Sequence, residues 1–137
     1  MELELRLGHG GRMKSHADES QKSVLDRHVF EELLATLGND RGRVRNVYRK
    51  FVDSAVARLA EVRNQSVTDS AATFHALKGS ASMVGANRVA SVAARLQDAA
   101  PRLDIETKVS AIDELEAELA AFRQALSALM DSITPDR

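Results

Sequence analysis

The stretch VRNVYRKFVDSAVARLAEV, Val44 to Val62, decides the fold class of this chain. Its apolar residues recur every three or four positions, which places them on one face of an α-helix. They are Val44, Tyr48, Phe51, Ala55, Leu59 and Val62. The sequence therefore predicts one long buried seam on a helix from about Arg41 to Asn64.

The rest of the chain has few residues that would interrupt helices. Proline occurs only at positions 101 and 135, and three of the glycines gather near the beginning, at Gly8, Gly10 and Gly11. Alanine, leucine, arginine and glutamate dominate, and tryptophan is absent. The body from about Val24 to Ile133 is predicted to be all-α.

Capping residues divide this body into five helices. Asp26 and Asp40 are predicted N-caps of the first two, and Asn87 of the fourth. Gly38 and Gly85 are predicted to end the first and third. The predicted helices are 26–38, 41–64, about 69–84, 87–100 and about 104–131.

Four long helices with short connections favour an antiparallel up-and-down four-helix bundle, with a short additional N-terminal helix packed across one end. On the last helix the seam has alternating steps of three and four, as in a bundle or a short coiled coil. It comprises Ile112, Leu115, Leu119, Phe122, Leu126 and Leu129. We expect residues 24–133 to form this domain and residues 1–23 to be a flexible tail or linker.

Composition excludes several classes of protein. The 19 basic and 20 acidic residues give a net charge of -1, which argues against a dedicated binder of nucleic acid or anionic membranes. Cysteine is absent, so there is no disulfide framework, thiolate metal site or cysteine nucleophile. No run of apolar residues is long enough for a signal peptide or a membrane-spanning helix. A soluble, cytoplasmic location is therefore expected.

The stretch FHALKGSA, Phe74 to Ala81, raises a question about function, because a glycine inside a helix costs about 1 kcal/mol relative to alanine. His75, Lys78, Gly79 and Ser82 fall on one face, next to the apolar stripe. Gly79 removes the side chain that would crowd the imidazole. His75 is therefore predicted at the rim of the core, within reach of water.

A neutral imidazole is a nucleophile near pH 7, and a nearby ammonium can screen phosphoryl oxygens. The sequence therefore favours phosphoryl acceptance on His75, with Lys78 as the charge partner. The simpler interpretation is an ordinary surface histidine, a solvated lysine and an incidental glycine. For His75, Lys78 or Gly79 alone, that interpretation would be preferred. Their occurrence on one face favours the chemical interpretation.

The string His75-Ala-Leu-Lys78-Gly79-Ser80-Ala81, followed by Gly85-Ala86, resembles the signature of histidine-containing phosphotransfer (HPt) domains. The likeness extends from about Leu25 to Leu126. It implies a four-helix bundle that takes a phosphoryl group from a receiver-domain aspartate and passes it to another receiver.

The resemblance also implies the site residues. His75 is the phosphoacceptor, Lys78 the charge partner and Gly79 the small residue that lets the receiver close over the ring. Gln97 falls where the family often has glutamate or glutamine and is expected either to orient the imidazole or to be a solvated amide. Ser80 and Ala81 complete the motif without an evident chemical task.

The chain is accordingly expected to be a phosphocarrier and not an ATP-dependent kinase, since it has no glycine-rich ATP lid or P-loop. It is expected to need no cofactor or metal of its own, because Mg²⁺ would be supplied by the receiver. Its partners would be receiver domains of a hybrid sensor kinase or a response regulator. A monomer is predicted, because the seam of the last helix is needed for the core.

Alternatives remain open at this point. The bundle could be a non-catalytic helical adaptor. The basic stretch RGRVRNVYRK, Arg41 to Lys50, could bind nucleic acid or steer an acidic receiver, although a solvated helix face explains it more simply. A di-metal site is disfavoured because no Glu-x-x-His occurs. Homodimerisation through the last helix is also possible.

Overall fold

The computed structural model describes residues 23–133, apart from the side chains at positions 67 and 68, and within this range it contains helices and no strand. The predicted tail 1–23 lies, except for Ser23, outside the described residues. The elements are α2 (Arg27–Thr36), α3 (Arg41–Asn64), α4 (Val67–Val84), α5 (Asn87–Ala99), a short 3₁₀ helix η1 (Ala100–Arg102) and α6 (Ile105–Ser132).

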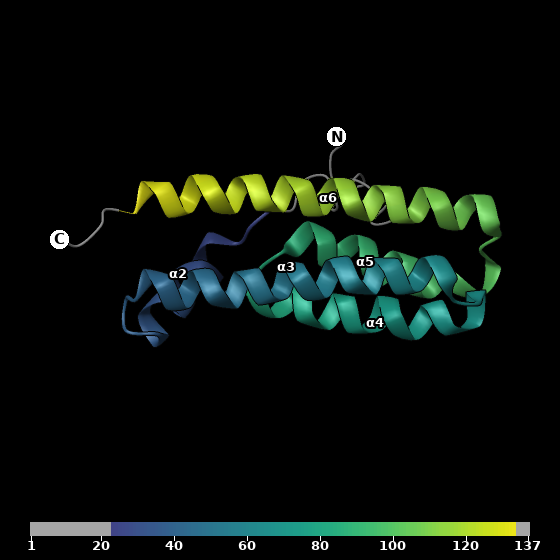
Figure 1. The fold of residues 1–137 in the computed structure, drawn as a ribbon, viewed down its shortest axis with the longest axis horizontal. Helices are drawn as coiled ribbons and strands as arrows, with labels where there is room; N and C mark the ends of the chain where they lie inside the picture. Colours follow the sequence, from purple (N-terminus) through teal and green to yellow (C-terminus); the bar gives the residue numbers. More distant parts are fainter. Residues whose placement is uncertain (1–22, 134–137) are drawn as a thin grey trace, which may run out of the picture.

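The long helices form a closed ring of neighbours in which α3 packs against α4 and α6, and α5 packs against the same two helices. Successive long helices run in opposite directions, and α2 lies at the end where α3 begins (Figure 1). Because α3 and α5 do not contact each other, the α3/α6 side of the molecule is opposite the α4/α5 side.

The core is built from the inward seams of all four long helices. Four aromatic rings form a chain through one end of it: Phe30, Tyr48, Phe122 and Phe51, with successive centroids 6.0, 5.9 and 5.4 Å apart. Each such contact contributes about 0.5–1.5 kcal/mol beyond the area it buries. The predicted seam of α3 is buried at all six positions.

Two predicted caps are confirmed. The Asp26 carboxylate accepts from the backbone N–H groups of His28 and Val29, and the Asp40 carboxylate accepts from that of Arg43. These N–H groups lack a partner within the helix, so each cap is expected to stabilise its helix by about 1 kcal/mol.

The predicted cap of α5 is wrong. Ala86 occupies the N-cap position and makes no side-chain cap. The Asn87 amide instead donates to Asp26 Oδ2 and to Ser23 Oγ, both at 3.3 Å. A tertiary hydrogen bond has replaced the local one, and it joins the start of α5 to the start of α2.

Three boundaries and one core position also differ from the prediction. α2 ends at Thr36, and Leu37, not Gly38, is its C-cap. α4 begins at Val67 with Ser66 as its N-cap, because the Ser66 hydroxyl accepts from Asp69 N–H and allows an earlier start. α5 ends at Ala99, and Pro101 lies in the following 3₁₀ turn. Ala99 is only half-buried, whereas Ala93 is fully buried in its place.

The turn between α4 and α5 is held by contacts from two other helices. Gly85 has a left-handed φ of 81° and its carbonyl accepts from Asp26 N–H at 2.7 Å. The buried Tyr48 hydroxyl donates to the Val84 carbonyl at 3.0 Å. Hydrogen bonds from the Val29 backbone N–H and then from the Asn87 side chain lower the pKa of Asp26. α4 therefore ends at a fixed point.

Candidate functional site

His75 is placed by the alternation of buried and exposed positions on α4. The residues beside it on the inward stripe, Phe74 and Leu77, are 0% and 1% exposed and anchor the helix in the core. His75 itself is exposed. The imidazole thus projects into solvent from a helix that is anchored in the core. This exposure makes it accessible to another protein.

Gln97 of α5 lies against this imidazole. Its Oε1 is 3.3 Å from His75 Nδ1. An amide oxygen only accepts, so this contact requires a proton on Nδ1, and in the neutral ring the lone pair is then on Nε2. Of the two roles open to Gln97, orienting the ring or pointing freely into water, the geometry favours the first.

Lys78 and Gly79 lie one turn beyond His75. Lys78 is half-buried, and within residues 23–133 its ammonium has no hydrogen bond or ion pair. A Cβ built on Gly79 would meet nothing within 4 Å, and its φ is not positive. Neither internal packing nor backbone conformation therefore requires a glycine at this position.

The other two residues of the motif have structural surroundings. The Ser80 hydroxyl donates to the Leu77 carbonyl at 3.3 Å, within its own helix. Ala81 is 0% exposed and belongs to the core. Nothing in these contacts assigns either residue a chemical task, as the sequence had indicated.

Met83 was missed by sequence reasoning. It is 80% exposed, the most exposed large apolar side chain among the described residues. His75, Gly79 and Met83 are four residues apart in turn and so form one ridge along α4. The available signal was an apolar residue that falls off the inward stripe.

The basic stretch Arg41 to Lys50 lies elsewhere, at the start of α3, and Arg45 and Arg49 border the α3/α6 side. Arg41 donates to the Met130 carbonyl, and Arg43 pairs with Asp40. Within the described ranges no three His, Asp or Glu side chains are grouped to hold a metal ion. Likewise, none of the described helices is long and apolar enough to cross a membrane.

A family model described as the Hpt domain matches residues 28–125. Comparisons with curated proteins and with solved structures gave no match. The matched range begins in α2, ends in α6, and includes both His75 and Gln97. The chain therefore belongs to the Hpt domain family, the histidine phosphocarriers of two-component signalling.

Proposed function

We propose that His75 accepts a phosphoryl group from the aspartate of one receiver domain and delivers it to the aspartate of another, as the intermediate of a multistep phosphorelay. The observation that carries this proposal is the pairing of an exposed His75, held at Nδ1 by Gln97, with the open space over Gly79. The nucleophile is oriented, and its approach is unobstructed.

The transfer step follows from the tautomer. The lone pair on Nε2 attacks phosphorus in line, and the bond from phosphorus to the aspartate oxygen breaks, which releases a carboxylate. The ring keeps its proton on Nδ1 and gains positive charge. The Gln97 oxygen then accepts a hydrogen bond from a cation, which is stronger than one from a neutral ring.

Lys78 and Gly79 have supporting roles in this proposal. The Lys78 ammonium attracts the phosphoryl oxygens, and Gly79 lets the receiver backbone approach the ring. The exposed Met83 adds apolar contact area on the same ridge. Mg²⁺ is assigned to the receiver and no cofactor to this chain.

We assign the fold to the up-and-down four-helix bundles with an added N-terminal helix, which the ring of neighbouring helices supports. The receivers we propose as partners belong to a hybrid sensor kinase or a response regulator, and we place the transfer in the cytoplasm.

The test is label transfer from a phosphorylated receiver domain to the purified chain. We expect acid-labile, alkali-stable label on the chain and none on His75→Gln. His28→Gln is the matched control, because His28 is also exposed and its contact is a surface pair with Glu32 at 3.1 Å; this variant should be labelled like the unaltered chain.

Equal labelling of His75→Gln would contradict the proposal. Failure of several receivers to label the unaltered chain would favour the alternative, a helical adaptor without chemistry. That alternative predicts that His75→Gln still binds its partner and still supports signalling.

A further inference from the structure

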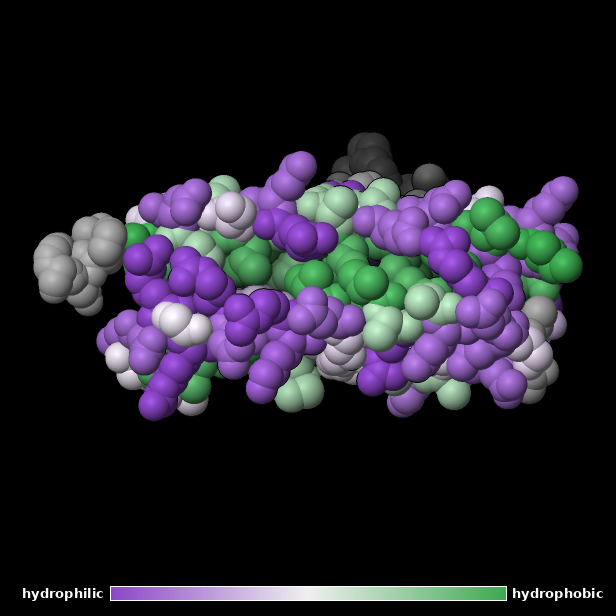
Figure 2. All heavy atoms as spheres, in the orientation of Figure 1, coloured by the Kyte–Doolittle hydropathy of each residue, from purple (hydrophilic) through white to green (hydrophobic). Residues whose placement is uncertain are grey.

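A groove runs between α3 and α6, on the side of the molecule opposite His75 and Gln97. It contains two adjoining hollows of about 360 Å³ and 430 Å³, and Arg123 of α6 lines both. Figure 2 shows apolar surface along the boundary between these two helices. The phosphotransfer site makes no use of this side.

Exposed apolar side chains are concentrated here. Of the four large hydrophobic residues that are exposed within residues 23–133, three belong to α3 or α6: Val56 (51% exposed), Ile105 (77%) and Val109 (47%). Val56 lines one of the hollows, and Ile105 and Val109 continue the line along α6. Single exposed apolar residues need no explanation, but a row beside a groove is typical of a contact surface.

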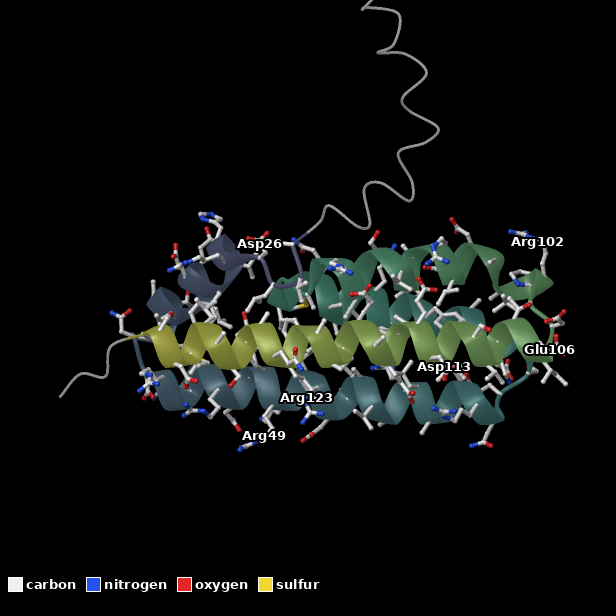
Figure 3. The ribbon with its side chains drawn as sticks, turned by 90° about the horizontal axis from the view of Figure 1, so that it is seen from above. Asp26, Arg49, Arg102, Glu106, Asp113 and Arg123 are labelled. Carbon is white, nitrogen blue, oxygen red and sulfur yellow. The ribbon has the colours of Figure 1, made fainter. Side chains whose placement is uncertain are left out.

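The charges along the groove are divided between its two ends (Figure 3). Arg49 and Arg123 lie toward the end where α3 begins, and Asp113 and Glu106 lie toward the end where α6 begins. Within the described part of the chain, the side chains of Arg123, Asp113 and Glu106 have no hydrogen bond or ion pair. Unpaired charges of opposite sign therefore lie at opposite ends of one apolar surface.

The net charge at each end of the groove is smaller than these groups alone suggest. Asp53 and Asp131 also line the basic end, together with Arg45, and Arg63 pairs with Glu116 toward the acidic end. The three arginines still outnumber the two aspartates at the first end. At the second, Arg63 is already neutralised by Glu116. Lys108 is also there, where its ammonium donates to the Gln65 carbonyl, so Asp113 and Glu106 exceed it by one charge.

We propose that a second copy of this chain covers the groove, in a dimer whose two-fold axis passes beside α6, between the two copies, at the level of position 118. A two-fold interface must be self-complementary, with each residue i meeting j while j meets i. Antiparallel α6 helices centred at 118 place Arg123 opposite Asp113 of the second copy, since each lies about 7.5 Å from the centre along the helix.

The residues near this axis permit close approach. Ala117 and Ala120 are both exposed and small, so two α6 backbones can come near each other there. Val56 of α3 and Ala120 line the same hollow. The dimer would bury this apolar centre between two sets of charge pairs and would leave both copies of His75 facing outward.

This proposal departs from the monomer that the sequence favoured. That prediction rested on the need for the α6 seam inside the core, and Ile112, Leu115, Leu119 and Phe122 are indeed buried. The proposed contact uses the exposed edge of α6. Leu119 also lines one of the hollows, but it is already buried at 5% exposure, so the dimer draws no side chain out of the core.

The test is sedimentation equilibrium of the full chain over a range of concentrations. We expect association to a mass of two chains. Arg123→Asp or Asp113→Arg alone would place like charges together twice per dimer and weaken association by at least about tenfold. The double variant restores both pairs with reversed sign and should associate nearly as the unaltered chain does.

Arg102→Asp is the charge control, because Arg102 lies in η1 on the far side of α6 from α3 (Figure 3); association should not change. Val56→Glu should also abolish association. All of these positions are exposed, so thermal unfolding should show each variant folded. A single-chain mass at every concentration would overturn the dimer, and a double variant that stays dissociated would overturn the proposed contact.

Discussion

Gly79 within α4 and Gly85 at its C-cap, six positions apart, are glycines for opposite physical reasons. Gly85 has a φ of 81°, and a Cβ there would lie 3.1 Å from the Cβ atoms of both Asp26 and Val29. Gly79 has ordinary helical geometry, and a Cβ there would meet nothing within 4 Å. The fold itself requires the first glycine and does not require the second.

This difference separates a part of the helix that the fold constrains from a part that is open to a partner. Around Gly85 every contact is internal, with Asp26 N–H on its carbonyl and Tyr48 on the carbonyl before it. Around Gly79 the surface is open, and the imidazole of His75 lies one turn earlier on the same face. A glycine inside a helix lowers stability. Where no internal contact requires it, its presence is better explained by contact with a partner.

The largest effect on stability is expected from Gly85→Ala. Left-handed backbone strain and the crowding against α2 should together lower the free energy of unfolding by about 2–4 kcal/mol. Gly38→Ala is the matched control, because Gly38 also has positive φ, 73°, but has open space around it. It should lose only the strain, about 1–2 kcal/mol, in urea unfolding. Equal losses would show that packing against α2 contributes nothing.

A smaller loss is expected from Tyr48→Phe, which leaves the buried Val84 carbonyl without its donor at a cost of about 1–2 kcal/mol. Urea unfolding at neutral pH measures it. An unchanged midpoint would mean that the α4–α5 turn does not depend on this hydrogen bond.

The same residue predicts a loss of stability in alkali. Burial raises the pKa of Tyr48 to about 12. This folded value lies above the unfolded value of about 10. The contribution of Tyr48 to the free energy of unfolding is therefore complete below pH 10 and is lost as the pH rises from 10 to 12. Tyr48 is the one tyrosine of the chain, and tryptophan is absent, so tyrosinate absorbance reports it directly. A midpoint near 10 in the folded protein would contradict this.

The smallest change in stability, and the one of opposite sign, is expected from Gly79→Ala. The exposed helical position should gain about 1 kcal/mol. Phosphoryl transfer to His75 should nevertheless slow, because the added methyl group obstructs the approaching receiver. Gly42→Ala, in the first turn of α3, is the control for the transfer rate and should leave it unchanged. Unchanged transfer in Gly79→Ala would remove the functional reason for that glycine.

Much of the fold was predictable because its causes are local. The seam of α3, the caps Asp26 and Asp40, and the glycine at the end of α4 all depend on residues within one or two turns. The cap of α5 was not predictable, because Asn87 is drawn away by Asp26, 61 positions earlier.

The sequence by itself determined which segments are helical, which faces are apolar, and that His75, Lys78 and Gly79 share a face, because helical neighbours are fixed by spacing along the chain. Only the tertiary structure decided that Gln97 meets His75, that a side chain at Gly79 would have no neighbour, and that Arg123 lines an open groove while Asp113 is exposed about one turn of α6 beyond it. Four apolar seams can cover one another in several arrangements, and it is their joint burial that selects which helices become neighbours.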